Sequence, residues 1–143
     1  MKVMYTAEVT TVDARHGHAR SSDGLLDIDL SRPVEMGGTG KATNPEQLFG
    51  AGYAACFGGA VEYNAQQKKI KTGTITVKSK VSLGPYDPGQ GEGFIIKVDL
   101  DVTLPEMDQA SAEELVALAH RTCPYSNATR GNIEVNLTTH GGK

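Results

Sequence analysis

The chain of 143 residues has no tryptophan, only two cysteines and no long apolar run. Two cysteines are too few for a framework of structural disulfides, and a domain of this length buries enough surface to fold without one. No window approaches the roughly 18 apolar residues of a membrane span. The first segment, MKVMYTAEVTTV, is too short and polar for a secretion signal. These absences predict one cytoplasmic domain over residues 1–143 that has no membrane partner.

Clustered positive charge and the usual metal-ligand spacings are absent as well. The net charge is −3 at pH 7, and the most basic stretch, QQKKIKTGTITVKSK, interleaves its lysines with other residues. A nucleic-acid surface needs a concentrated basic stripe, so we expect no nucleic-acid partner. The four histidines are scattered and there is no CxxC pair. We therefore expect neither a metal site nor a resident cofactor.

Two alternating segments near the start are typical of strands. KVMYTAEVTTV, residues 2–12, alternates apolar and polar residues, and LLDIDL, residues 25–30, does the same. A turn is expected at Gly17 between them, so this part predicts an antiparallel meander. The glycine-rich stretch at 31–45, SRPVEMGGTGKATNP, reads as a loop.

A long helix follows this loop. Asn44 is a good capping residue, Pro45 fits the first helical position, and the helical pattern continues to about Lys68. The middle, residues 50–60, is mostly glycine and alanine. Glycine inside a helix costs roughly 1 kcal/mol against alanine. The four glycines of this stretch therefore need a packing reason, and we expect a central buried helix that a neighbouring backbone approaches closely.

The second half of the chain predicts two long strands, a helix and a last strand. Residues 74–83 and 94–104 alternate over their whole length, and 133–139 alternates again. Ser111 and Glu114 form a capping box before a helix that runs to Cys123. Strands, helix, strands, helix and strand in this order predict an α+β fold.

The two cysteines stand in different surroundings. A thiol reacts as its thiolate, which needs a positive neighbour or a helix N-terminus to form near neutral pH. Cys56 lies inside the glycine-rich helix, where burial raises a thiol pKa. It is therefore an inert packing residue unless a cation reaches it. Cys123 precedes Pro124 and the amides of a short turn, which favour a thiolate, although a buried structural thiol is the alternative. The residues alone leave both choices open.

Two segments carry a resemblance to a known family. TNPEQLFGAGYAACF and CPYSNATRGNI resemble the signature segments of the organic hydroperoxide resistance (Ohr) proteins of the OsmC-like superfamily. RSSDGLLDIDL and EMGGTG are similar to further segments of that family, and the likeness continues to about Leu137. The resemblance implies antiparallel sheets packed around a central helix, in an intertwined homodimer.

The resemblance also implies a function and roles for residues. Its members are thiol peroxidases that reduce organic hydroperoxides. By position, Cys56 would be the peroxidatic cysteine, Cys123 the resolving cysteine, and Glu46 and Arg15 the active-site ion pair, with Arg20 as a nearby rival for the arginine. An external dithiol, the dihydrolipoyl group of a lipoylated protein, would reduce the resulting disulfide. An apolar site would favour fatty or aryl hydroperoxides.

Two other functions compete with this one. The first is an OsmC-type peroxidase with a broader substrate range. The second is a non-enzymatic dimer that binds an apolar ligand between its subunits and uses its cysteines only for packing. Relative rates on alkyl hydroperoxide and hydrogen peroxide separate the first from the Ohr function. Loss of thiols after peroxide treatment separates the second.

The spacing of Glu46 and Cys56 raises a geometric question. Ten residues of unbroken helix separate two positions by about 15 Å and rotate one away from the other by about 80°. One straight helix therefore cannot bring both side chains to the same sulfur. Either the helix breaks near Gly50 or Gly52, or a second subunit supplies Glu46.

Overall fold

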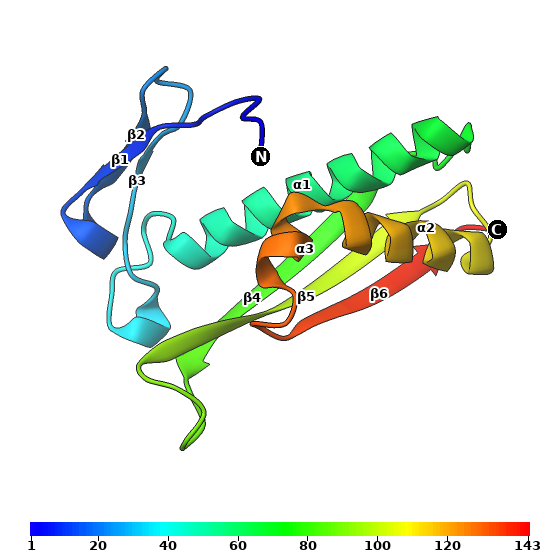
Figure 1. Ribbon diagram of the computed structural model, residues 1–143. Coiled ribbons are helices and arrows are strands. Elements are labelled where there is room, and N and C mark those ends of the chain that lie inside the picture. Colours follow the sequence, from blue (N-terminus) through cyan, green and yellow to red (C-terminus); the bar gives the residue numbers. More distant parts are fainter. The chain divides into compact units, whose positions relative to one another are not determined.

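The computed structural model of the protein covers residues 1–143 and confirms the α+β class. The chain divides into two compact units, Met1–Leu48 and Phe49–Lys143. Each unit has its own three-stranded sheet (Figure 1). None of the helices is long and apolar enough to cross a membrane.

The first unit contains the predicted antiparallel meander. Its strands are β1 (Val9–Val12), β2 (His18–Ser21) and β3 (Asp27–Asp29), paired in the order β1-β2-β3. The turn after β1 is tight and includes a short 3-10 helix, η1 (Ala14–His16). A second one, η2 (Val34–Met36), lies in the glycine-rich loop. No other residue fits at Gly17, because a Cβ there would lie 1.7 Å from the Val12 carbonyl oxygen.

The first strand is shorter than the sequence predicts. It begins at Val9, opposite Ser21 of β2, and residues 1–8 form no regular structure. The Ser22 amide still donates to the Glu8 carbonyl at 2.9 Å, but the chain then turns toward β3, so the residues before Glu8 have no partner strand within the chain. Their alternating apolar side chains are exposed, including Val3 and Tyr5 at 62% and 79%.

The long helix, α1 (Pro45–Lys68), begins and ends where predicted. Asn44 caps it, since its side-chain oxygen accepts a hydrogen bond from the Gln47 amide at 2.9 Å. The helix is continuous through Gly50 and Gly52. The possibility that it breaks there is therefore wrong.

In the second unit, the sheet order is β4-β5-β6. The strands are β4 (Thr76–Pro85), β5 (Phe94–Leu104) and β6 (Val135–Gly141), and helices α2 (Gln109–Thr122) and α3 (Pro124–Thr129) stand between the last two. β4 and β5 are antiparallel, but β6 pairs parallel with β5. This sheet is therefore mixed rather than antiparallel, because α2 and α3 form a crossover that returns the chain in the same direction. Figure 1 shows the helices along one face of the sheet.

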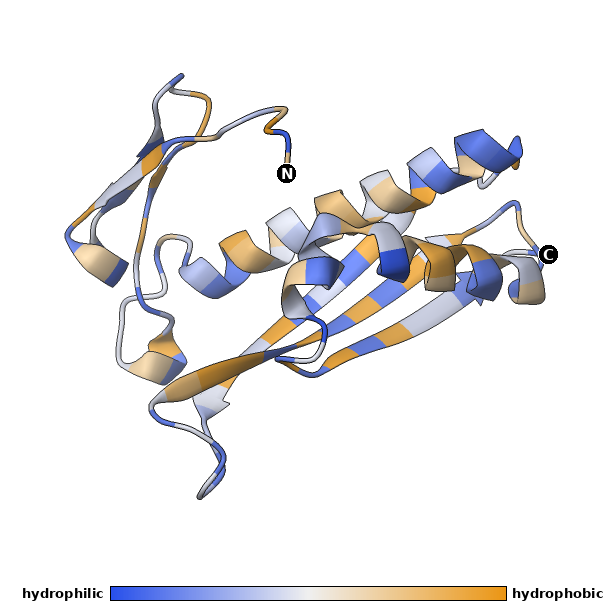
Figure 2. Cartoon of the chain, viewed as in Figure 1, coloured by the Kyte–Doolittle hydropathy of each residue, from blue (hydrophilic) through white to orange (hydrophobic).

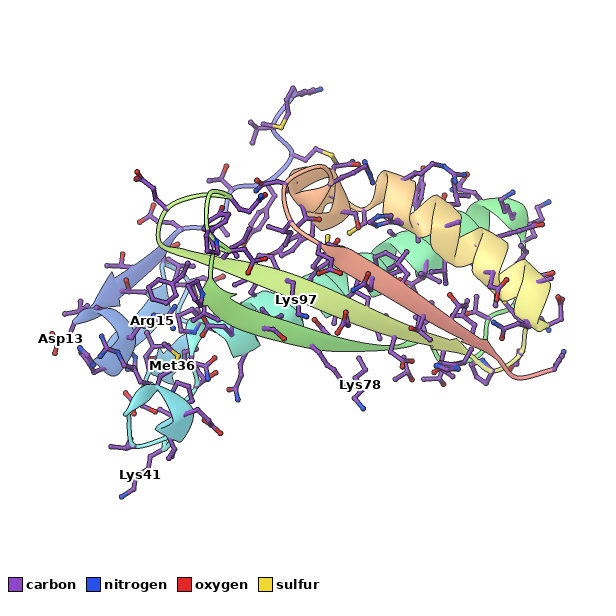
Figure 3. The ribbon with its side chains drawn as sticks, turned by 90° about the horizontal axis from the view of Figure 1, so that it is seen from below. Asp13, Arg15, Met36, Lys41, Lys78 and Lys97 are labelled. Atoms are coloured by element: carbon purple, nitrogen blue, oxygen red, sulfur yellow. The ribbon has the colours of Figure 1, made fainter.

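The core of this unit lies between the helices and that face. Alternate residues of β5 are buried, and the strands in Figure 2 change between apolar and polar along their length. Aromatic and aliphatic residues of α1 and α2 cover them: Tyr53, Phe57, Val61, Leu115, Val116 and Ala119. The other face is polar, with Lys78 opposite Asp101 and Lys80 opposite Asp99. Figure 3 shows this face, with Lys78 and Lys97 labelled.

The start of α2 and one end of β5 differ from the sequence analysis. Asp108, not Ser111, caps α2: its carboxylate accepts a hydrogen bond from the Ser111 amide at 2.9 Å. A capping aspartate three residues before Ser111 moves the helix start toward the N-terminus. Phe94, the first residue of the alternating segment 94–104, is 72% exposed in the chain.

Candidate functional site

The structure brings the two cysteines into contact. Their Sγ atoms are 3.6 Å apart, although 67 residues separate them in sequence. Both are free thiols. Cys56 comes from the middle of α1 and Cys123 from the junction of α2 and α3, so only tertiary structure pairs them.

The segment Thr-Cys-Pro shapes the corner that holds Cys123. A residue before proline avoids helical backbone angles, and Cys123 has φ −67° and ψ 127°. Its amide still donates to Ala119 at 2.8 Å, and its carbonyl accepts from the Asn127 amide at 2.9 Å. Cys123 thus ends one helix and begins the next, with its side chain 0% exposed.

The surroundings of Cys56 do not favour its thiolate. Burial raises the pKa of the Cys56 thiol, a hydrogen bond from the Tyr125 backbone N–H opposes this, and the neighbouring Cys123 raises the pKa further. None of these groups is a cation. A reactive Cys56 therefore needs a positive charge that these neighbours do not provide.

The ring of Tyr125 explains one glycine of α1. The ring centroid lies 5.6 Å from that of Tyr53 and 6.0 Å from that of Phe49. A Cβ on Gly52 would be 2.8 Å from the Tyr125 hydroxyl oxygen. The close approach predicted for this helix is therefore made here by a side chain, not by a backbone. This contact at Gly52 lies one helical turn before Cys56, and side chains on a helix tilt toward its N-terminus.

Arg15 and Glu46 form a bidentate ion pair. Nη1 donates to Oε2 at 3.0 Å and Nη2 donates to Oε1 at 2.9 Å. Their hydrogen bonds lower the pKa of the Glu46 carboxyl below its usual value, although burial opposes the shift. Arg15 lies on the turn after β1, as Figure 3 shows, and Glu46 on the first turn of α1. Arg20 is exposed on β2 and makes no such pair.

The structure therefore joins the four predicted residues as two pairs. Arg15 pairs with Glu46 in the first unit, and Cys56 with Cys123 in the second. No group of three or more potential metal ligands is close enough to hold an ion.

Sequence reasoning missed a set of polar side chains near the thiols. Tyr53, Ser126, Thr129 and His120 are joined by hydrogen bonds, and Asn64 bonds to Thr122. Burial, followed by the charge of Arg130, lowers the pKa of His120. Apolar periodicity gives no sign of these contacts, because each depends on which helices meet. The crowding of Ser, Asn and Thr into the helix after Cys123 was the one available signal.

Known proteins are similar to this chain over nearly its whole length. Residues 38–138 match the family described as OsmC-like protein. The organic hydroperoxide resistance protein of Xanthomonas axonopodis pv. citri (strain 306) is 53% identical over 139 residues, which cover 96% of this chain and 95% of the relative. Organic hydroperoxide resistance protein OhrB of Bacillus subtilis (strain 168) is 48% identical over 136 residues, covering 94% and 96%. The crystal structure of an organic hydroperoxide resistance protein OsmC from Legionella pneumophila has a TM-score of 0.92 at 45% identity, covering 97% and 99%.

The ion pair predicts a pH dependence of stability. Because Arg15 lowers the pKa of Glu46, the pair stabilises the fold fully above the ordinary glutamate pKa of 4.5, and this contribution is lost as the pH falls through the lower pKa of the folded state. We expect Glu46→Gln to lower the free energy of unfolding by about 1 kcal/mol at neutral pH. Urea unfolding at successively lower pH should show this difference shrinking.

The matched control is Glu62→Gln, at an exposed position of the same helix without an ion pair. It should change stability little at any pH. A Glu46→Gln effect that stays constant into the acid range would contradict the ionic origin of the stabilisation.

Proposed function

Because this chain belongs to the organic hydroperoxide resistance proteins of the OsmC-like family, we propose that it is a thiol peroxidase that reduces organic hydroperoxides to alcohols. The observation that carries the proposal is the contact of two free thiols, 3.6 Å apart between their sulfurs. Such a pair can pass from dithiol to disulfide with little movement of the chain.

The proposed reaction has three balanced steps. The Cys56 thiolate attacks the distal oxygen of ROOH, the O–O bond breaks, and the alkoxide takes a proton to leave as ROH, so Cys56 becomes a sulfenic acid. The Cys123 sulfur then attacks the Cys56 sulfur, which forms the disulfide and releases water. An external dithiol reduces the disulfide by exchange and is itself oxidised to a disulfide. No resident cofactor takes part.

Aromatic side chains beside Cys56 support an apolar substrate. Phe57 is fully buried next to it in sequence, and the rings of Phe49 and Tyr53 on α1 cluster with the ring of Tyr125 on α3. Each methylene that enters such surroundings gains about 0.8 kcal/mol. Fatty-acid, alkyl or aryl hydroperoxides should therefore react in preference to hydrogen peroxide.

Arg15 is the proposed source of the positive charge that Cys56 needs. The bidentate bond to Glu46 fixes the orientation of the guanidinium and leaves other N–H groups free for the thiolate. Since α1 is unbroken, Glu46 and Cys56 of one chain lie about 15 Å apart along the helix. We infer that the protein is a two-fold homodimer in which Arg15 and Glu46 of one chain serve the Cys56 of the other.

The two cysteines should fail in different ways when replaced. Cys56→Ser should abolish hydroperoxide reduction, because no peroxidatic thiolate remains. Cys123→Ser should consume one equivalent of an alkyl hydroperoxide and then stop as a sulfenic acid that oxidises further to sulfinic acid. Single-turnover peroxide consumption and the intact mass of each product measure these outcomes. Sustained turnover by Cys56→Ser would show that the roles are wrong, and no thiol loss in the wild type would favour a non-enzymatic ligand-binding function.

The reductant should be a slender dithiol. Cys123 is fully buried and Cys56 only partly, so the reductant must attack the Cys56 sulfur. A dithiol then closes on itself and releases Cys56, whereas a monothiol needs a second molecule to do so. We expect dihydrolipoamide, a mimic of a lipoylated protein, to reduce the disulfide at least about tenfold faster than an equal thiol concentration of a monothiol. Equal rates with dihydrolipoamide and a thioredoxin system would count against a lipoyl partner.

Mixing two inactive variants tests whether sites are shared between subunits. Cys56→Ser and Glu46→Ala are unfolded together, refolded and assayed. If the pairs act across the dimer, each heterodimer contains one site with all four groups and recovers about half of the activity of a wild-type dimer. If heterodimers form, as shown by a tag on one variant, and remain inactive, Glu46 serves the Cys56 of its own chain.

A further inference from the structure

Two hydrogen-bonded ties join the parts of the second unit that hold the cysteines. The Tyr53 hydroxyl lies 2.9 Å from the Ser126 Oγ, which connects α1 to α3. The Asn64 side-chain amide donates to the Thr122 Oγ1 at 2.9 Å, which connects α1 to the last residue of α2.

The ties lie on both sides of the thiol pair. On α1, Cys56 stands between Tyr53 and Asn64. At the α2–α3 corner, Cys123 stands between Thr122 and Ser126. Tyr53, which precedes Cys56, bonds to Ser126, which follows Cys123. Asn64, which follows Cys56, bonds to Thr122, which precedes Cys123. The two segments therefore pass each other in opposite directions, and the sulfurs lie between the ties.

The tie through Tyr53 is buried and fully hydrogen-bonded. Tyr53 and Ser126 are both 0% exposed. Thr129 donates to the Ser126 carbonyl, so the Tyr53 hydroxyl can donate to Thr129, Ser126 to Tyr53, and the Nδ1–H of His120 to Ser126. Counted this way, each hydroxyl gives its one proton and accepts another. The reverse order forms one hydrogen bond fewer, so this direction is favoured.

Much of α1 around Cys56 has small side chains. Tyr53 and Phe57 are fully buried in the core, but Gly52, Ala54, Ala55 and Gly58 in the same turns interlock little with neighbours. Hydrogen bonds are directional, and a buried hydroxyl or amide that loses its partner is costly. The two ties therefore add directional constraints on the spacing of the helices to the apolar packing of Tyr53 and Phe57.

We propose that Tyr53, Ser126, Asn64 and Thr122 are positioning residues that hold the Cys56 and Cys123 sulfurs in contact and so raise the effective concentration of one thiol at the other. The proposal rests on the proposed function for its purpose, because a sulfenic acid that waits for its resolving thiol is exposed to irreversible oxidation by a second peroxide. The hydrogen bonds of the ties act on the sulfur–sulfur distance, and Tyr53→Phe keeps the ring of Tyr53 in the aromatic cluster.

The experiment measures that effective concentration without hydroperoxide. Full-length protein is equilibrated anaerobically with mixtures of reduced and oxidised glutathione, in which the protein dithiol and one glutathione disulfide exchange to the protein disulfide and two glutathione thiols. Alkylation and intact mass give the fraction oxidised. Tyr53→Phe and Thr122→Val each delete one hydroxyl of a different tie at nearly constant shape. Tyr63→Phe, on the same helix with its side chain 61% exposed, is the matched control.

Each test variant should lower the effective concentration about fivefold to tenfold, and the double variant should lower it further, while Tyr63→Phe leaves it unchanged. Urea unfolding of the reduced proteins distinguishes this positioning role from a purely structural one. A purely structural role would lower the free energy of unfolding and leave the glutathione equilibrium at its wild-type value. That outcome, a rise in effective concentration, or an equal fall in the control would overturn the proposal. Because Thr122 is exposed, its variant should fold even if Tyr53→Phe does not. If the wild type forms the disulfide but consumes no hydroperoxide, the proposed peroxidase function fails and this result stands.

Discussion

The contact between the Cys56 and Cys123 sulfurs is the constraint on which the second unit depends. One thiol must project from the middle of a long helix and the other from a corner between two helices. The proline after Cys123 makes the corner, since it ends α2 and begins α3 at the same residue. Gly52 makes room for Tyr125 one turn before Cys56, since a Cβ there would lie 2.8 Å from the Tyr125 hydroxyl oxygen. The proline of one segment and the glycine of the other thus both contribute to the arrangement in which the Cys56 and Cys123 sulfurs lie 3.6 Å apart.

The electrostatics of the two pairs are complementary. Burial raises the pKa of the Cys56 thiol, and the groups that shift this pKa include no cation. Arg15 carries a positive charge, and its pairing with Glu46 does not use all of its hydrogen-bond donors. Two of the five guanidinium N–H groups bond to the carboxylate, and three remain. A carboxylate partner weakens the net charge of the arginine but holds its plane in one orientation.

Local signals in the sequence predicted most of the elements, and tertiary pairing decided the rest. Asn44 and Pro45 predicted the start of α1 correctly, because capping depends on a few neighbouring residues. The capping box at Ser111 was wrong, since Asp108 offered a competing cap three residues earlier. The parallel direction of β6 follows from where α2 and α3 return the chain, which no strand pattern records. The ties of Tyr53 and Asn64 escaped notice for the same reason. The pairing of the cysteines came from resemblance, not from their spacing.

Surfaces left open in each unit bear on the proposed dimer. In the first unit, the alternating segment before β1 has strand character but no partner strand, and its Val3 and Tyr5 are exposed. In the second unit, one face of α1 buries Tyr53 and Phe57, while the opposite face, with Ala51, Ala55 and Gly59, is exposed. Neither the strand-like apolar alternation nor the small-residue stretch from Ala51 to Gly59 is stabilised by exposure to water in a monomer. A second chain that pairs with the segment and packs on the small-residue face would bury both, which is why an intertwined two-fold arrangement suits this sequence better than a lone chain.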